Sequence, residues 1–218
     1  MDAEGLDDEV TGCAAAHQRL LTDLDGLTDV QARADSLLPK WTVGHVLNHL
    51  VRNAESMIRV FAAAADGLVV ERYVGGSPGR DAGIEAGADR SADELVADVR
   101  STIWRLEQSW ATASAAAWHG RCVETSGREI PVPHLPFLRW REVEIHHADL
   151  GLGFTFDDWS AEYVAAELAE QLPRLPERVG GAADAIPSIR AELGDHRFLA
   201  WIVGRWTRPD LPAIGPWK

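Results

Sequence analysis

The stretch FLRWREVEIHHADL, residues 137–150, places carboxylates and imidazoles together inside an apolar helical pattern. At about 100° per residue, Glu142 and His146 fall on one face of the predicted helix, flanked by apolar side chains. Glu144 and His147 fall roughly opposite, on the side that this periodicity assigns to solvent. Side chains four residues apart stack on a helix, so Glu142 and His146 can bind one metal ion together. A buried Glu–His ion pair is the alternative that this helix alone leaves open.

Three further segments carry apolar residues at helical spacing, at residues 7–24, 42–64 and 91–118. The second opens on a threonine suited to an N-cap, and the third opens on the capping-box pattern Ser-Ala-Asp-Glu. With residues 137–150, these segments make four helices whose apolar stripes are one-sided. Four such helices bury one another best as a bundle.

One histidine of the second helix is placed to join the Glu–His pair. His49 lies on the flank of the apolar arc, whereas His45 lies about 40° further from its centre. Alone, His49 could be a hydrogen-bonded interface residue. In a bundle it can converge with Glu142 and His146 on one ion. Two histidines and one carboxylate on one side of a metal leave positions open for exchangeable ligands.

Residues 67–90 are rich in glycine and acidic residues, and they lack a clear helical or strand period. They are predicted to form a long irregular segment, of the kind that serves as a lid or binding loop. Arg72, Arg80 and Arg90 lie on this segment and could bind an anion. A solvated connection with ordinary surface arginines is the alternative.

The C-terminal part of the chain has a different character. Asp157 or Asp158 is predicted to cap a fifth helix over residues 160–172. The residues beyond it are too few for a large independent core. We therefore expect two parts, a bundle over residues 1–155 and a small segment over residues 156–218 packed on it. An apolar run in that segment ends at Arg205, which either reaches the bundle mouth or lies on the surface of a core helix.

Composition limits the classes of partner. The chain has 218 residues, a net charge of -13 and a pI near 5.0, which argues against nucleic acid and anionic membranes as partners. An anionic small molecule would need arginines concentrated in a pocket. There is no apolar run of membrane-spanning length and no secretory pattern at the start, so we expect a cytoplasmic protein.

The two cysteines make no disulfide framework, and Cys13 and Cys122 are expected to be thiols. Cys13 and His17 are four residues apart on the first helix and form another possible ligand pair. A small buried cysteine beside a helix-face histidine is the commoner arrangement.

Three stretches resemble the mycothiol-dependent maleylpyruvate isomerase family, whose metal-binding bundle belongs to the wider DinB-like superfamily. They are LPKWTVGHVLNHLVRNAESM, FLRWREVEIHHADLGLGF and, more weakly, FLAWIVGR with the closing LPAIGPW. The resemblance implies a mainly α, DinB-like four-helix bundle. It also implies His49, Glu142 and His146 as the metal ligands. Relatives carry a longer α/β domain at the C-terminus, so here we expect a shortened appendage.

The same resemblance implies an enzyme of the gentisate route that isomerises maleylpyruvate to fumarylpyruvate, with a divalent metal, zinc by this donor set, and the thiol mycothiol as cofactors. The metal-bound thiolate would add to the double bond, the resulting single bond would rotate, and elimination would give the trans isomer. Arg80 and Arg205 would hold the dicarboxylate substrate and stabilise the developing enolate charge.

Two alternatives remain open. The same ligands would serve a thiol S-transferase or a metal-assisted hydrolase. A non-catalytic zinc-binding bundle that regulates a partner would be expected to hold its metal in a closed four-ligand site. The sequence offers three convincing ligands and no clear fourth, which favours an open, catalytic site.

Overall fold

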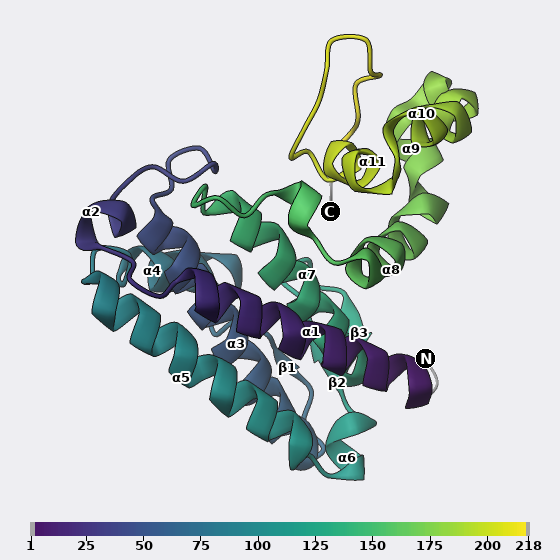
Figure 1. Cartoon of the computed structure of the whole chain (residues 1–218). Helices are drawn as coiled ribbons and strands as arrows, with labels where there is room; N and C mark the ends of the chain where they lie inside the picture. Colours follow the sequence, from purple (N-terminus) through teal and green to yellow (C-terminus); the bar gives the residue numbers. More distant parts are fainter. Residues whose placement is uncertain (1–2, 217–218) are drawn as a thin grey trace. The chain divides into compact units, whose positions relative to one another are not determined.

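The chain divides into two compact units. A computed structural model describes residues 3–216, and the first unit ends at Leu152 where the second begins at Gly153. Each unit has its own set of helices (Figure 1). Within the described residues, no helix combines the length and the apolarity needed to cross a bilayer. The attachment of residues 156–218 to the bundle stays a prediction.

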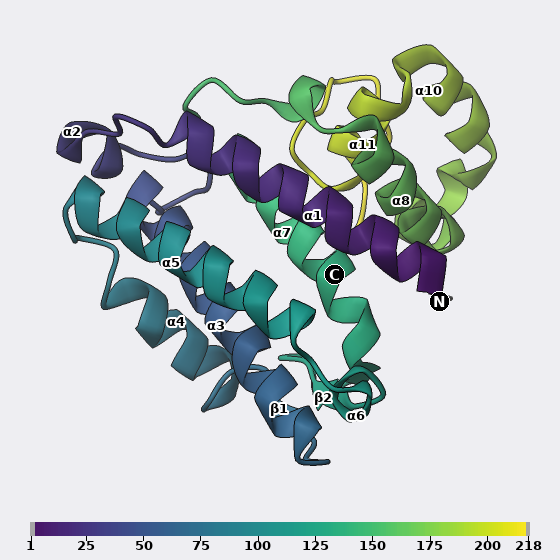
Figure 2. The same ribbon diagram turned by 60° about the horizontal axis from the view of Figure 1, so that its bottom comes forward.

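The first unit is built on four long helices, α1 (Ala3–Asp23), α3 (Val43–Ala65), α5 (Ala92–Ala111) and α7 (Leu135–Asp149). Helix α3 packs against α5 and α7, and α1 packs against α7 and α5. Figures 1 and 2 show the four helices alongside one another. This arrangement confirms the predicted bundle. Its fully buried side chains include Leu20, Leu24, Leu47, Leu50, Met57, Leu95 and Leu106.

Capping residues set where the central helices begin. The Thr42 side chain accepts a hydrogen bond from the backbone N–H of His45, and the His45 imidazole accepts one from the backbone N–H of Thr42. The imidazole of His45 is therefore part of a capping box. Ser91 caps α5 in the same way, as predicted. The predicted continuous helix to residue 118 is wrong, because α5 ends at Ala111 and Ser114 caps a new short helix, α6. A serine that accepts a backbone bond starts a helix as readily as it interrupts one.

The prediction of an irregular segment over residues 67–90 is also wrong. It contains strand β1 (Val70–Glu71) and helix α4 (Gly76–Glu85), and α4 packs against α3. The periodicity of apolar residues does not reveal this helix, because its glycines contribute no side chain to an apolar stripe. One of them is required by packing, since a Cβ on Gly79 would lie 2.0 Å from the carbonyl oxygen of Val74.

A small three-stranded sheet closes the end of the bundle near α3. Strand β1 pairs in parallel with β2 (Arg121–Val123), and β2 pairs antiparallel with β3 (Glu129–Pro131). The buried Cys122 of β2 lies between Val70 and Ile130 of its neighbours. The remaining short elements of this unit are α2 (Asp29–Ala32), α6 (Ala115–Trp118) and a 3-10 turn at Val132–His134.

Helix α7 is buried nearly all round, and this corrects the predicted solvent face. Glu144 is only 1% exposed and accepts a 2.5 Å hydrogen bond from Arg19 of α1. His147 is 3% exposed and lies 3.0 Å from a carboxylate oxygen of Asp23, also at α1. Periodicity assumes one buried side, but α7 has α1 on one side and α3 on another. The side that carries Glu142 and His146 is therefore the less buried one.

The second unit is made of short helices, and no strand occurs between residues 153 and 216. The predicted cap at Asp157 or Asp158 is wrong, because Ser160 caps the first of these helices. Asp158 instead closes a 3-10 turn by accepting bonds from Thr155. The run 198–203 is buried and forms the core helix of this unit. The elements are α8 (Ala161–Gln171), α9 (Leu175–Val179), α10 (Ile186–Leu193) and α11 (Asp195–Ile202), with 3-10 turns at Phe156–Asp158, Leu172–Arg174 and Gly180–Ala185.

Candidate metal centre

Three side chains from two helices converge at one point of the bundle. His49 comes from α3, and Glu142 and His146 come from α7 one turn apart. The Glu142 Oε2 atom lies 2.7 Å from His49 Nε2 and 3.3 Å from His146 Nε2. One ligand atom from each residue falls within 4.8 Å of the other two. The structure therefore brings together the three residues that the sequence singled out.

Neighbouring residues orient both imidazoles. Asp149 accepts a 2.8 Å hydrogen bond from His146 Nδ1, which leaves Nε2 as the nitrogen that faces Glu142. A metal-binding imidazole usually donates its other N–H to a carboxylate or carbonyl oxygen, which fixes the orientation of the ring. On the other side, Arg80 Nη2 lies 3.4 Å from His49 Nδ1. Because arginine can only donate, His49 Nδ1 accepts and Nε2 faces Glu142.

His49 and Glu142 have the protonation states of metal ligands. Burial lowers the pKa of His49 to about 4, so its imidazole is neutral near pH 7. Burial alone would raise the pKa of Glu142, but His49 and His146 outweigh it and hold that pKa well below its usual range. Burial also opposes charge on His146, yet its bonds to Asp149 and Glu142 raise its pKa overall. Glu142 is thus an ionised carboxylate between two imidazoles.

The centre is open on one side. The side chain of His49 is 2% exposed, while those of His146 and Glu142 are 15% and 26% exposed. The ring of Trp41 lies 5.6 Å from that of His49 and forms part of the wall. Two imidazole nitrogens and one carboxylate oxygen fit a zinc-type divalent ion. Among the described residues, no fourth His, Cys, Asp or Glu joins the group, as in a site that keeps a position for an exchangeable ligand.

Comparisons with known proteins give the family and the fold. The sequence profile described as "Mycothiol maleylpyruvate isomerase N-terminal domain" matches residues 13–151. The chain belongs to this family. A solved structure titled as the mycothiol-dependent maleylpyruvate isomerase is 27% identical, with a TM-score of 0.71, over 76% of this chain and 68% of that one. A histidine-to-alanine mutant of that isomerase matches at 26% identity and a TM-score of 0.70, over the same shares. No curated protein matches the chain.

The family match covers the whole candidate centre. Residues 13–151 include the three converging side chains and Arg80, so the isomerase-family domain corresponds to the bundle. Arg205 lies outside the match, in the second unit, where its Nη1 atom donates to the carbonyl of Val203. Its place in a substrate site stays a prediction.

Other sequence candidates have structural roles. His45 is engaged in the cap of α3, with its second nitrogen 3.3 Å from Glu85. Arg90 pairs with Asp98 at 2.8 Å. Cys13 is buried, and burial raises the pKa of its thiol far above its usual range. It lies beside the equally buried ring of His17. This is the packed cysteine–histidine arrangement that was expected to be commoner than a metal-ligand pair.

Sequence reasoning missed a buried network next to the centre. Arg139 of α7 is 1% exposed and donates to His17 Nε2 at 3.1 Å, to the Leu50 carbonyl at 2.8 Å and to Asn53 Oδ1 at 3.0 Å. His17 in turn contacts Glu107 at 2.8 Å. Arg139 therefore ties α7 to α3 immediately beside the ligand positions. Asp149 was missed too, although its spacing of three from His146 could have signalled it.

Proposed function

We propose that this chain is a metal- and mycothiol-dependent isomerase that converts maleylpyruvate to fumarylpyruvate. The observation that carries the proposal is the open His49–Glu142–His146 centre inside the isomerase-family domain. A closed regulatory zinc site would need a fourth protein ligand. Three ligands with an exposed side favour a site at which a second molecule binds and reacts.

The chain's own residues would hold a divalent ion and leave one side free. An ion bound there would lower the pKa of a bound thiol, which then acts as a thiolate nucleophile near neutral pH. Asp149 keeps the His146 ring oriented, and Arg139 keeps the two ligand-bearing helices in register. With Nε2 of His49 committed as a ligand, its hydrogen lies on Nδ1, and Arg80 loses that acceptor. The Nη2 side of the Arg80 guanidinium is then available to an anion, while its Nη1 atom keeps the 2.7 Å pair with Asp81.

The substrate proposed is a dicarboxylate, which an acidic protein binds only at a local concentration of positive charge. Arg80 supplies such a charge beside the centre, where its Nη2 atom lies 3.4 Å from His49. Arg205 is proposed as a second carboxylate partner. A guanidinium suits both roles, because it donates paired hydrogen bonds to a carboxylate and stabilises charge on an enolate oxygen.

The test follows the loss of maleylpyruvate by the zinc-loaded protein with and without mycothiol. We expect isomerisation that requires the thiol and falls at least about a hundredfold in Arg80→Ala, a loss typical of removing a group that stabilises charge in the transition state. Arg128→Ala is the matched control, because Arg128 is exposed and pairs only with Glu124 of its own turn. Equal rates with and without mycothiol would rule the mechanism out. Thiol conjugation or hydrolysis of substrates without isomerisation would instead indicate the S-transferase or hydrolase.

A further inference from the structure

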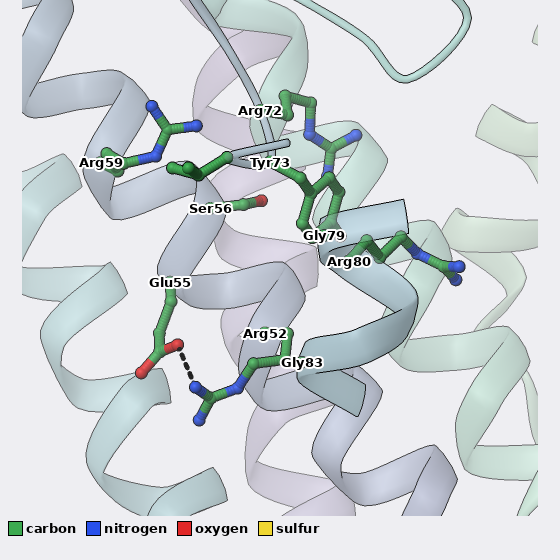
Figure 3. A pocket seen from close by; sticks show the side chains of 10 residues that line it. Arg52, Glu55, Ser56, Arg59, Arg72, Tyr73, Gly79, Arg80 and Gly83 are labelled. Carbon is green, nitrogen blue, oxygen red and sulfur yellow. Dashed lines mark ion pairs between the residues drawn. The ribbon is translucent and has the colours of Figure 1, made fainter. Parts of the chain in front are cut away.

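A cavity lies between α3, the residues that follow β1, and α4 (Figure 3). It measures about 260 Å³, enough for a small ligand. Its lining includes four arginines and a single carboxylate, in a chain whose net charge is -13. Such a concentration of positive charge on an acidic protein is typical of an anion site. The charged and aromatic lining residues are Arg52, Glu55, Arg59, Arg72, Tyr73 and Arg80.

Two of these arginines already have a carboxylate partner. Arg52 pairs with Glu55 at 2.9 Å, and Figure 3 shows both turned towards each other. Arg80 pairs with Asp81 at 2.7 Å and extends from α4 away from Arg52 (Figure 3). Among the residues described, Arg59 donates only to the backbone carbonyl of Glu71. In the described part of the chain, Arg59 and Arg72 are therefore the two lining arginines that have no carboxylate partner.

Arg72 is the unusual member of the set. It is 8% exposed, yet its Nε and Nη2 atoms have no hydrogen-bond partner in the described part of the chain. Its guanidinium carbon lies 5.7 Å from the centre of the Tyr73 ring. Its backbone N–H donates to the carbonyl of Val123 at 2.8 Å, so the end of β2 holds the residue in place. A buried guanidinium without acceptors is costly unless a bound anion supplies them.

A hydroxyl completes the donor set. Tyr73 Oη accepts a 3.5 Å contact from Asn53 Nδ2, so the phenol hydrogen is left to donate. We propose that this cavity binds a carboxylate group of a small anionic ligand through Arg72, Arg59 and Tyr73. Paired N–H donors of a guanidinium match the two oxygens of a carboxylate.

The cavity adjoins the metal centre through one residue. Arg80 lines it, and the same side chain reaches His49 at 3.4 Å. A dicarboxylate is therefore the ligand class to expect, and to this extent the inference rests on the proposed function. Binding itself requires neither the metal nor the thiol, so the two proposals can fail separately.

The experiment measures binding of maleate by calorimetry to the full-length, zinc-loaded protein. Arg72→Met should weaken binding at least about tenfold, as expected for losing a charge-assisted hydrogen bond. The same variant without ligand should keep or raise the melting temperature, because it removes a buried charge that lacks partners. Arg59→Met should also weaken binding, whereas the exposed Arg128→Met should leave it unchanged. Maleate binding that is equal in the wild type and in both cavity variants would overturn the proposal.

Two further arms make the outcomes distinct. His146→Ala is expected to bind maleate normally while losing metal, since the cavity does not use the metal ligands. A zinc-loaded wild-type protein that binds maleate but does not isomerise maleylpyruvate in the presence of mycothiol would contradict the proposed function and leave the carboxylate site standing. Inorganic phosphate that binds more tightly than maleate, and in the same Arg72-dependent way, would contradict the assignment to a carboxylate.

Discussion

At the scale of single residues, Asp149 deserves a test because it acts on the centre through another side chain. It accepts the Nδ1 hydrogen of His146 at 2.8 Å and is itself buried. Asp149→Ala should weaken zinc binding about 10- to 100-fold, since His146 would lose its fixed tautomer and orientation. Competition with a chromophoric chelator measures the affinity.

The conservative variant separates positioning from packing. Asp149→Asn keeps an acceptor oxygen of nearly the same shape, so its zinc affinity should lie between those of the wild type and Asp149→Ala. Unchanged affinity in Asp149→Ala would show that His146 needs no partner at Nδ1.

How far the centre could be predicted depends on the residue. Glu142 and His146 follow from a spacing of four, and His49 from the flank of a second helix and the family resemblance. The argument from burial was wrong, because Glu144 and His147 are the more buried pair. Periodicity finds which residues share a face, and only the position of α1 decides which face is covered.

At the scale of elements, starts of helices were predictable where a side chain caps the backbone. Thr42 and Ser91 accept bonds from the third residues of α3 and α5, a local signal that needs no tertiary contact. The break before α6 and the glycine-containing α4 were missed. The break before α6 depends on a second capping serine, Ser114, and α4 depends on the close packing of its glycines. An apolar stripe shows neither feature.

The contact between α3 and α7 rests on a polar link that can be tested. Arg139→Met would leave the acceptors on His17, Leu50 and Asn53 without their buried donor. The free energy of unfolding in urea should fall by about 2 kcal/mol or more. The exposed Arg128→Met should change it by less than about 0.5 kcal/mol. Equal stability of Arg139→Met and the wild type would mean that apolar packing alone holds the helices together.

At the scale of the whole molecule, the acidic chain concentrates its chemistry in the first unit. The family match, the three converging side chains and the arginine-lined cavity all lie before residue 152. The general argument that an acidic protein needs clustered arginines to bind an anion came from composition alone. Composition does not say which arginines cluster, because Arg72 and Arg59 meet only where the residue after β1 lies beside α3.

The central claim is that His49, Glu142 and His146 hold a metal with a position open to a thiol. Cobalt(II) in place of zinc makes this visible, because a thiolate bound to cobalt adds an intense near-ultraviolet charge-transfer band. Titration of the cobalt-loaded protein with mycothiol should produce that band with about one equivalent, as one open position requires. His146→Ala should lack it. The account would be contradicted if the spectrum of the bound cobalt did not change when mycothiol was added. It would also be contradicted if His146→Ala showed the same band.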